Sequence, residues 1–264
     1  MKHILSYGGG VNSSALFFYL LEKEINLDLV IFADTGEESP ETYDAVNRME
    51  IICKEKRIAF ARVYRMHDMK KINLYDYYLE KKKVMSFMRR DCTGKFKVAP
   101  IRKHIREIFG KKETFVMYIG ITFDEFHRCK KSNVKYIEQV YPFVDDKIDR
   151  QGNLEILIKN KFKAEKSGCI GCIYNKKQTW IEMLQKNPKE FERHKLLEMS
   201  NTRYPNIPIS EWKKKFMVDG KLTKSYITLN PNYRLEDLEK QYKTQLTGFI
   251  DIEPTCDVSG GCFL

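Results

Sequence analysis

A pair of cysteines near position 170 has the spacing of a metal-binding turn. Cys169 and Cys172 are separated by two residues, and at that spacing one turn can present two thiolates to a metal centre. Two ligands do not complete a site, and the tail supplies two further candidates, Cys256 and Cys262. The spacing alone is compatible with an iron–sulfur cluster, a structural zinc ion or a redox dithiol.

A glycine-rich loop is the second feature that could do chemistry. Three glycines follow a short apolar segment and precede Asn12, Ser13 and Ser14, which open a helical pattern. Glycine lets the backbone approach phosphate oxygens, and a helix amino terminus offers free N–H groups and the positive end of its dipole. We therefore predict a phosphate-binding loop, although no Gly-Lys-Ser/Thr of a Walker loop follows. The residues expected around a bound nucleotide are Ser6, Gly8, Gly9, Gly10, Asn12 and Ser13.

A carboxylate follows the second apolar segment of the chain. Asp34, Thr35 and Gly36 come directly after residues 27–33, and open α/β sheets bind ligands at the carboxyl ends of their strands. We expect this turn to contribute to the nucleotide site, with Asp34 contacting the ribose or the adenine edge. Simple capping of a turn is the alternative.

These residues require strands and helices that bring them to one edge of a sheet. Apolar segments predict strands at residues 3–7, 27–33, 59–64 and 114–120, with residues 140–144 as a candidate fifth. Helical patterns lie between them, and Pro40 suits the first position of one that runs to Lys56. This alternation predicts an α/β fold with a doubly wound, mainly parallel sheet. Helical patterns dominate after Gly168, so we expect a nucleotide-binding domain over residues 1–165 and a helical region over residues 166–264.

Several motifs follow one another in order over residues 4–180. The loop runs Gly8-Gly9-Gly10-Val11-Asn12-Ser13, and the Asp34 turn is followed by Pro40-Glu41-Thr42-Tyr43. Later segments contain Cys92, Lys95 and Pro100, then Gly120, Asp124, Glu125 and Arg128, then Pro142 and Asp145, and finally Cys169 and Cys172. This order resembles the phosphoadenosine phosphosulfate (PAPS) reductase family of the PP-loop adenine nucleotide alpha-hydrolase superfamily. The loop departs from the family's Ser-Gly-Gly-x-Asp-Ser pattern at Gly8, which replaces serine, and at Asn12, which replaces aspartate.

The resemblance implies a larger metal centre than the spacing of two cysteines shows. It places Cys92 near Cys169 and Cys172 as a third ligand, with Cys256 or Cys262 as the fourth. Members with the same Gly-Cys-x-x-Cys segment hold an iron–sulfur cluster, which makes a cluster the preferred expectation over Zn²⁺. The sulfurs are expected roughly 3.5–4 Å from one another, as thiolates about 2.3 Å from a shared metal would be.

The resemblance also implies which residues hold an anionic ligand. Gly120 belongs to a segment that borders the nucleotide, and Lys95 and Arg128 are the first candidates to contact phosphate or sulfate and to take part in catalysis. Lys97 and Arg102 lie on the same matched segments. Glu125 could hold Mg²⁺ against the phosphates or pair with Arg128, and the pair is favoured.

The family leaves three functions open. The first is ATP-dependent adenylylation with pyrophosphate release, coupled to sulfur transfer onto a nucleic acid or a small acceptor. The second is reduction of PAPS or adenylyl sulfate, in which Cys256 or Cys262 attacks sulfur and thioredoxin resolves the intermediate. The tail around Cys256 lacks the Gly-Leu-His of the family's reductases, which favours the first function. The third is a nucleotide sensor without catalysis.

Composition limits the partners and the compartment. The formal net charge of +11 favours polyanionic partners such as tRNA or DNA. Seven cysteines without an export signal argue against a disulfide framework, so we expect a cytoplasmic protein and structural roles for Cys53 and Cys129. No apolar run is long enough to cross a membrane, and the oligomeric state is not indicated.

Overall fold

The computed structural model describes residues 1–85, 90–201, 217–218, 221–222, 229 and 233–250. The tail cysteines Cys256 and Cys262 lie outside these residues. The chain divides into two compact units, each described by itself. Met1–Tyr77 and Arg90–Cys172 form the first unit, and Tyr78–Arg89 with the chain from Ile173 onward forms the second.

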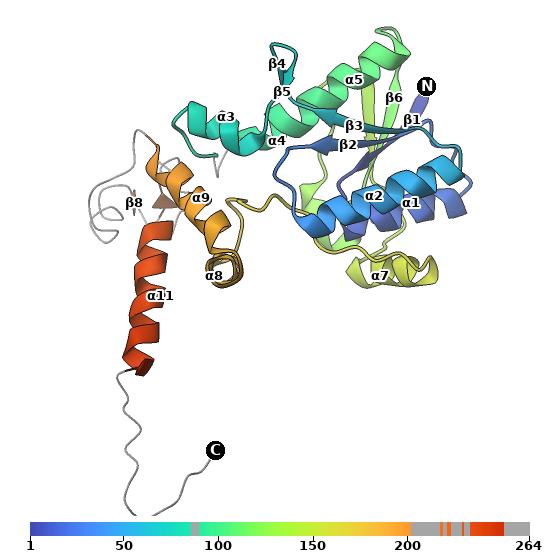
Figure 1. Ribbon diagram of the computed structural model, residues 1–264. Coiled ribbons are helices and arrows are strands. Elements are labelled where there is room, and N and C mark those ends of the chain that lie inside the picture. Colours follow the sequence, from blue (N-terminus) through green and yellow to red (C-terminus); the bar gives the residue numbers. More distant parts are fainter. Residues whose placement is uncertain (86–89, 202–216, 219–220, 223–228, 230–232, 251–264) are drawn as a thin grey trace, which may run out of the picture. The chain divides into compact units, whose positions relative to one another are not determined.

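The first unit is built on one parallel sheet (Figure 1). Its strands stand in the order β3-β2-β1-β6-β7, and every neighbouring pair is parallel. Their bounds are β1 Lys2–Tyr7, β2 Leu29–Asp34, β3 Phe60–Tyr64, β6 Phe115–Ile119 and β7 Ile137–Val140. The predicted α/β fold with a mainly parallel sheet is confirmed.

Helices cover both faces of this sheet because its strands are apolar on both sides (Figure 1). One core contains residues of α1 (Val11–Glu22), α2 (Pro40–Glu55) and α7 (Arg150–Lys159) packed against alternate strand residues such as Leu5 and Val30. The other core packs α5 (Ala99–Phe109) against the intervening residues, including Ile4 and Ile31. Such two-sided burial explains the continuous apolar runs that predicted these strands.

Short elements complete the first unit: β4 Met66–His67, β5 Lys70–Lys71, α4 Asp91–Thr93, the π-helix η1 Gly94–Val98, the 3-10 helix η2 Phe123–Arg128 and α6 Pro142–Asp145.

The strand predicted at residues 140–144 is wrong. The strand β7 ends at Val140, and Pro142 then occupies the first turn of α6. Proline lacks the N–H that a sheet ladder needs and has the φ of a first helical turn.

The described part of the second unit is mainly helical. It contains α8 Lys177–Lys186, α9 Pro188–Met199, α11 Leu235–Ile250 and the strand pair β8 Met217–Val218 and β9 Lys221–Leu222, while α3 Leu74–Glu80 crosses from the first unit into the second. The helical patterns predicted after Gly168 are confirmed for these described residues. None of the helices described is both long and apolar enough to cross a membrane.

Candidate active site

The central strand β1 ends at the point where the sheet's connections change direction. It lies between β2 and β6. The helix α1, which follows β1, and the helix α5, which precedes β6, pack on opposite faces of the sheet. Loops after such strands diverge and leave a crevice. A cavity of about 500 Å³ opens there. Its lining consists of Ser6, Gly8, Gly10, Val11, Asn12, Ser13, Ile119, Gly120, Thr122, Asp124, Glu125, Arg128, Arg150, Lys166 and Ser167.

Two glycines near the cavity are each needed for a different reason, Gly9 in the glycine loop and Gly120 after β6. Gly9 has a φ of +71°, and a Cβ there would lie 2.7 Å from Cγ2 of Thr42, so this residue packs against α2 and does not line the cavity. Gly120 sits at the end of β6, where a Cβ would lie 2.9 Å from the backbone nitrogen of Ser13. The missing side chain therefore lets β6 approach the amino terminus of α1.

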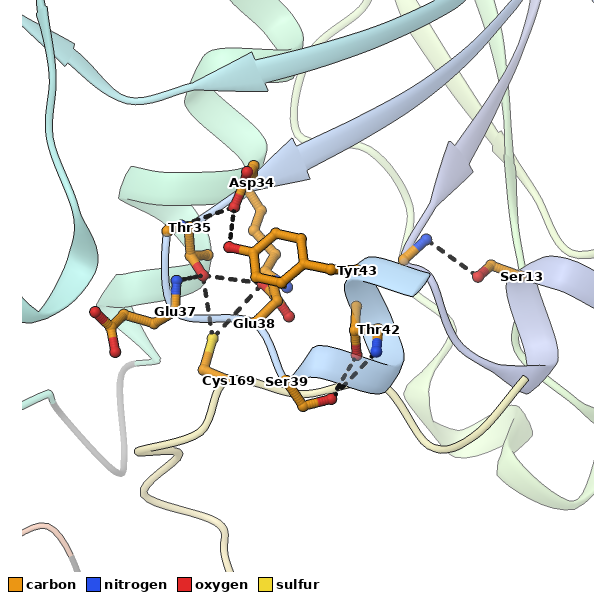
Figure 2. A network of polar contacts seen from close by, with 12 residues as sticks. Ser13, Asp34, Thr35, Glu37, Glu38, Ser39, Thr42, Tyr43 and Cys169 are labelled. Carbon is orange, nitrogen blue, oxygen red and sulfur yellow. Dashed lines mark hydrogen bonds and ion pairs between the residues drawn. The ribbon is translucent and has the colours of Figure 1, made fainter. Parts of the chain in front are cut away.

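The hydroxyl of Ser13 holds the loop itself. Its Oγ accepts a hydrogen bond from the backbone N–H of Gly8 (3.1 Å, Figure 2) and donates to the carbonyl of Gly10 (3.2 Å). The residue is only 8% exposed. Ser13 therefore lines the cavity as predicted, but its hydroxyl stabilises the turn before any ligand arrives.

The side-chain amide of Asn12 contacts both a basic and an acidic residue of the cavity lining. Its Oδ1 accepts hydrogen bonds from Arg150 (2.8 Å) and Asn153 (3.2 Å), and its Nδ2 donates to Oε2 of Glu125 (3.1 Å). The other Glu125 oxygen accepts from Arg128 at 2.5 Å. An aspartate at position 12 would place a carboxylate against Glu125. The departure from the family pattern at Asn12 thus fits this chain's own neighbours.

Among the lining residues that were not selected from the sequence, three come from α7 and the segment after it. Arg150 begins α7, and Lys166 and Ser167 lie in the segment that follows it. This segment runs along the loop, since the N–H of Val11 donates to the carbonyl of Glu165 at 3.2 Å. The sequence signal for Arg150 and Lys166 is only their basic character, which many exposed residues of this chain share.

The turn after β2 lies outside the lining of this cavity. Oδ1 of Asp34 accepts hydrogen bonds from the N–H of Gly36 and the hydroxyl of Tyr43, each at 2.8 Å (Figure 2). Asp34 is 8% exposed. It therefore caps the turn, and its contact with a nucleoside stays a prediction.

Lys95 is also placed away from the cavity lining. Its ammonium contacts the Asp91 carboxylate at 2.8 Å and lies 5.4 Å from the centre of the Tyr77 ring. Burial alone would lower the pKa of Lys95, but the hydrogen bond and charge of Asp91 raise it. The role of Lys95 in anion binding stays a prediction.

Cys169 is paired with the turn after β2 (Figure 2). It forms a β-bridge with Glu38, and its Sγ lies 3.6 Å from Oε1 of Glu38 and 3.4 Å from the hydroxyl of Thr35. The same Glu38 oxygen contacts the ammonium of Lys97 at 2.8 Å. Burial raises the pKa of the Cys169 thiol far above its usual range, and the Glu38 carboxylate adds to this.

The other two predicted ligands lie close enough to interact with this group. Burial raises the pKa of Cys92, with smaller contributions from Asp91 and from Cys172. Burial alone would lower the pKa of Lys97, yet Glu38, Cys169 and Cys92 together raise it. Among the residues that the structure describes, Cys92, Cys169 and Cys172 do not have all three sulfurs within 4.8 Å of one another. This separation is wider than the spacing expected from the sequence.

Two cysteines are separate from this group. Cys53 is buried in α2, where desolvation raises its pKa to about 12. Cys129 follows η2 and is partly buried. Neither residue lines the cavity at the end of β1, and their structural roles stay a prediction.

The fold and the cavity at its switch point define an α/β protein with a glycine-rich loop at the end of its central strand. A family model, the phosphoadenosine phosphosulfate reductase domain, matches residues 2–231, and the chain belongs to this family. No curated protein matches the sequence. A solved structure, the U34-tRNA thiolase NcsA from Methanococcus maripaludis with its [4Fe-4S] cluster, is similar at 14% identity and a TM-score of 0.46. The match covers 99% of this chain and 76% of the thiolase, and at this similarity its substrate is not transferred.

Proposed function

We propose that the protein binds ATP at the cavity after β1 and adenylylates an acceptor, which then receives sulfur. The observation that carries the proposal is the cavity's lining, which combines the amino terminus of α1 with Arg128, Arg150 and Lys166. Helix amino termini and guanidinium groups are the donors that phosphates prefer. A nucleoside triphosphate carries negative charge that these basic side chains and the helix amino terminus can offset.

The proposed chemistry has two balanced steps. A carbonyl oxygen of the acceptor attacks the α-phosphorus of ATP, and the bond to the pyrophosphate leaving group breaks. Sulfide-level sulfur then attacks the activated carbon, and AMP departs with the former carbonyl oxygen. Arg128 and Lys166 would offset the charge that develops on the phosphates, and the Asn12 amide would hold Arg150 and Glu125 in place.

The cysteine group supports a sulfur-handling role. Cys92, Cys169 and Cys172 offer three soft donors, and they fit a cluster better than a single ion because each thiolate of a cluster binds a different iron. The spacing of their sulfurs, wider than one shared ion requires, agrees with that choice. A bound cluster would hold or deliver sulfur and would keep these buried thiols ionised.

Pyrophosphate release tests this function. Purified protein with ATP, Mg²⁺ and a sulfur donor should release pyrophosphate only when a competent acceptor is added, with tRNA, single-stranded DNA and small carbonyl compounds tested in separate arms. The matched control for Arg128→Ala is Arg106→Ala, since Arg106 contacts the carbonyl of Lys111 and lies outside the cavity lining. Release unaffected by Arg128→Ala would contradict the assignment.

The family match favours one other reaction. Reduction of PAPS or adenylyl sulfate would use a tail thiol, Cys256 or Cys262, as the nucleophile, and thioredoxin would then reduce the resulting intermediate. Thioredoxin-dependent sulfite release, lost when both tail cysteines are replaced by serine, would establish this reaction instead. Nucleotide binding without either product would leave a sensor function.

A further inference from the structure

We infer that Glu38 supplies an oxygen ligand to the metal centre of Cys92, Cys169 and Cys172. The inference rests on the metal centre of the proposed function and adds a ligand that the cysteine spacing does not show. Glu38 belongs to the loop between β2 and α2, whereas Cys169 begins the Cys-x-x-Cys segment. The evidence is the burial, the partners and the position of its carboxylate.

One oxygen of the Glu38 carboxylate is buried without a hydrogen-bond partner. The side chain has no exposed surface, and its Oε1 contacts Lys97 at 2.8 Å and accepts from the hydroxyl of Thr35 at 3.0 Å. Oε2 has no hydrogen-bond partner among the described residues. Leaving a buried carboxylate oxygen unpaired costs several times what an ordinary hydrogen bond contributes. A positively charged atom at Oε2 would remove that cost.

The carboxylate lies next to the first thiol of the proposed centre. Sγ of Cys169 lies 3.6 Å from Oε1 of Glu38. In a cluster each thiolate binds a different iron, so a carboxylate this close to one thiolate would bind a neighbouring iron of the same cluster. Because Lys97 and Thr35 hold Oε1, Oε2 is the oxygen free to bind that iron.

The backbone fixes this pairing. The β-bridge between Glu38 and Cys169 is extended on both sides, because Ser39 donates its N–H to Gly168 (3.0 Å) and Ile170 donates to Glu37 (2.8 Å). Two segments about 130 residues apart in the chain are thus joined like neighbouring strands. Figure 2 shows the Cys169 sulfur pointing toward Glu38 and Thr35.

Lys97 completes the environment that a carboxylate ligand needs. Its ammonium holds Oε1 and offsets one negative charge, which leaves Oε2 as the oxygen available to metal. Ligating carboxylates are commonly oriented in this way by a hydrogen-bonded neighbour. An oxygen donor is harder than a thiolate, so Glu38 would be the ligand that an incoming sulfur donor exchanges most readily.

X-ray absorption at the metal edge of the loaded protein tests the inference. After anaerobic purification and reconstitution, the wild type should show a light scatterer at about 2.1 Å beside sulfur at about 2.3 Å. Glu38→Gln should lose the light scatterer and hold less metal, while Glu41→Gln, on the exposed first turn of α2, should match the wild type. If iron is bound, Mössbauer spectra should show one iron site that changes only in Glu38→Gln.

A second variant guards against a folding artefact. Glu38→Gln leaves Lys97 as a lone buried cation, so Glu38→Gln/Lys97→Met removes both charges and should also lose the light scatterer. A sulfur-only shell in the wild type, or a light scatterer retained in both variants, would overturn the inference. The inference would also be overturned if the light scatterer were lost when serine replaces Cys256 and Cys262 but retained when Glu38 is replaced. If the protein holds no metal and still releases pyrophosphate, the inference about Glu38 is wrong and the proposed adenylylation is supported. If it holds an oxygen-ligated metal and releases no pyrophosphate, the inference about Glu38 is supported and the proposed adenylylation is wrong.

Discussion

At the scale of single residues, the candidate site contains a residue without a side chain, Gly120, and a neutral amide, Asn12, at positions where a larger or charged side chain would disturb its neighbours. Gly120 leaves room for the amino terminus of α1, and Asn12 is an amide that donates to one charged neighbour and accepts from another. For the proposed function, neither residue needs to contact the ligand in order to matter. Gly120 allows β6 to approach the amino terminus of α1, and Asn12 contacts Arg150 and Glu125.

Gly120→Ala should weaken nucleotide binding through the backbone. The added Cβ would lie 2.8 Å from the carbonyl carbon of Asn12, and backbone must move to relieve such a contact, at a cost of about 1–3 kcal/mol. We expect a roughly tenfold or greater loss of ATP affinity by calorimetry. Gly94→Ala is the matched control, because a Cβ at Gly94 meets nothing within 4 Å. Equal affinities in the two variants would contradict this account of the loop.

Asn12→Asp should restore the family's pattern and yet impair this chain. The new carboxylate would face Glu125 without the Nδ2 donor that now joins the two side chains at 3.1 Å. We expect weaker ATP binding that Asn12→Asp/Glu125→Gln partly recovers, measured as a double-mutant cycle. Improved binding in Asn12→Asp alone would show that the amide is no adaptation to Glu125.

At the scale of elements, the segment after α7 connects the phosphate cavity with the thiols. Lys166 and Ser167 line the cavity, and Cys169 pairs with Glu38 only two residues later. The sequence shows the strands well because they are apolar on both faces, and it shows the Cys-x-x-Cys spacing directly. It does not show that Glu38 is buried, since that burial arises only when this distant segment pairs with the β2–α2 loop.

The same limit explains the other differences between sequence and structure. Arg150 becomes a wall of the cavity only because α7 packs against α1, a tertiary contact that no local pattern encodes. Asp34 has the right position at a strand end, but its partners are Gly36 and Tyr43. Strand-end position alone therefore does not assign a side chain to the cavity.

In the second unit, the buried Glu198 of α9 should make stability depend on pH. Burial raises its pKa to about 8, against hydrogen bonds from the N–H groups of Leu235 and Leu229 that lower it. A raised folded-state pKa means that the stabilising effect of the protonated group is complete below its ordinary value of 4.5 and is lost as pH rises to about 8. Relative to Glu198→Gln, the wild type should lose unfolding free energy across this window in urea titrations. A pH-independent difference between the two would contradict the assignment.

At the scale of the whole molecule, ligand binding should appear as stability, because a ligand that binds only the folded chain shifts the unfolding equilibrium. ATP at a hundred times its dissociation constant stabilises a binding-competent fold by about 2.7 kcal/mol. The formal net charge of +11 makes any polyanion a weak stabiliser, so the increase in Tm must be separated from general charge attraction. Two neighbouring lysines of the first unit allow that separation.

Lys166→Ala should reduce the ATP-induced increase in Tm, whereas Lys163→Ala should not. Both lysines are exposed and lie three residues apart, so each variant removes the same charge from the same segment, but only Lys166 lines the cavity. Loss of one charge-assisted contact to phosphate, about 1.5–3 kcal/mol, should weaken ATP binding roughly tenfold or more. Without nucleotide the two variants should melt together, and in high salt the difference between them with ATP should persist, because contacts inside a cavity are less screened than surface charge. Equal ATP-induced increases in Tm would mean that the phosphates do not bind at the end of β1.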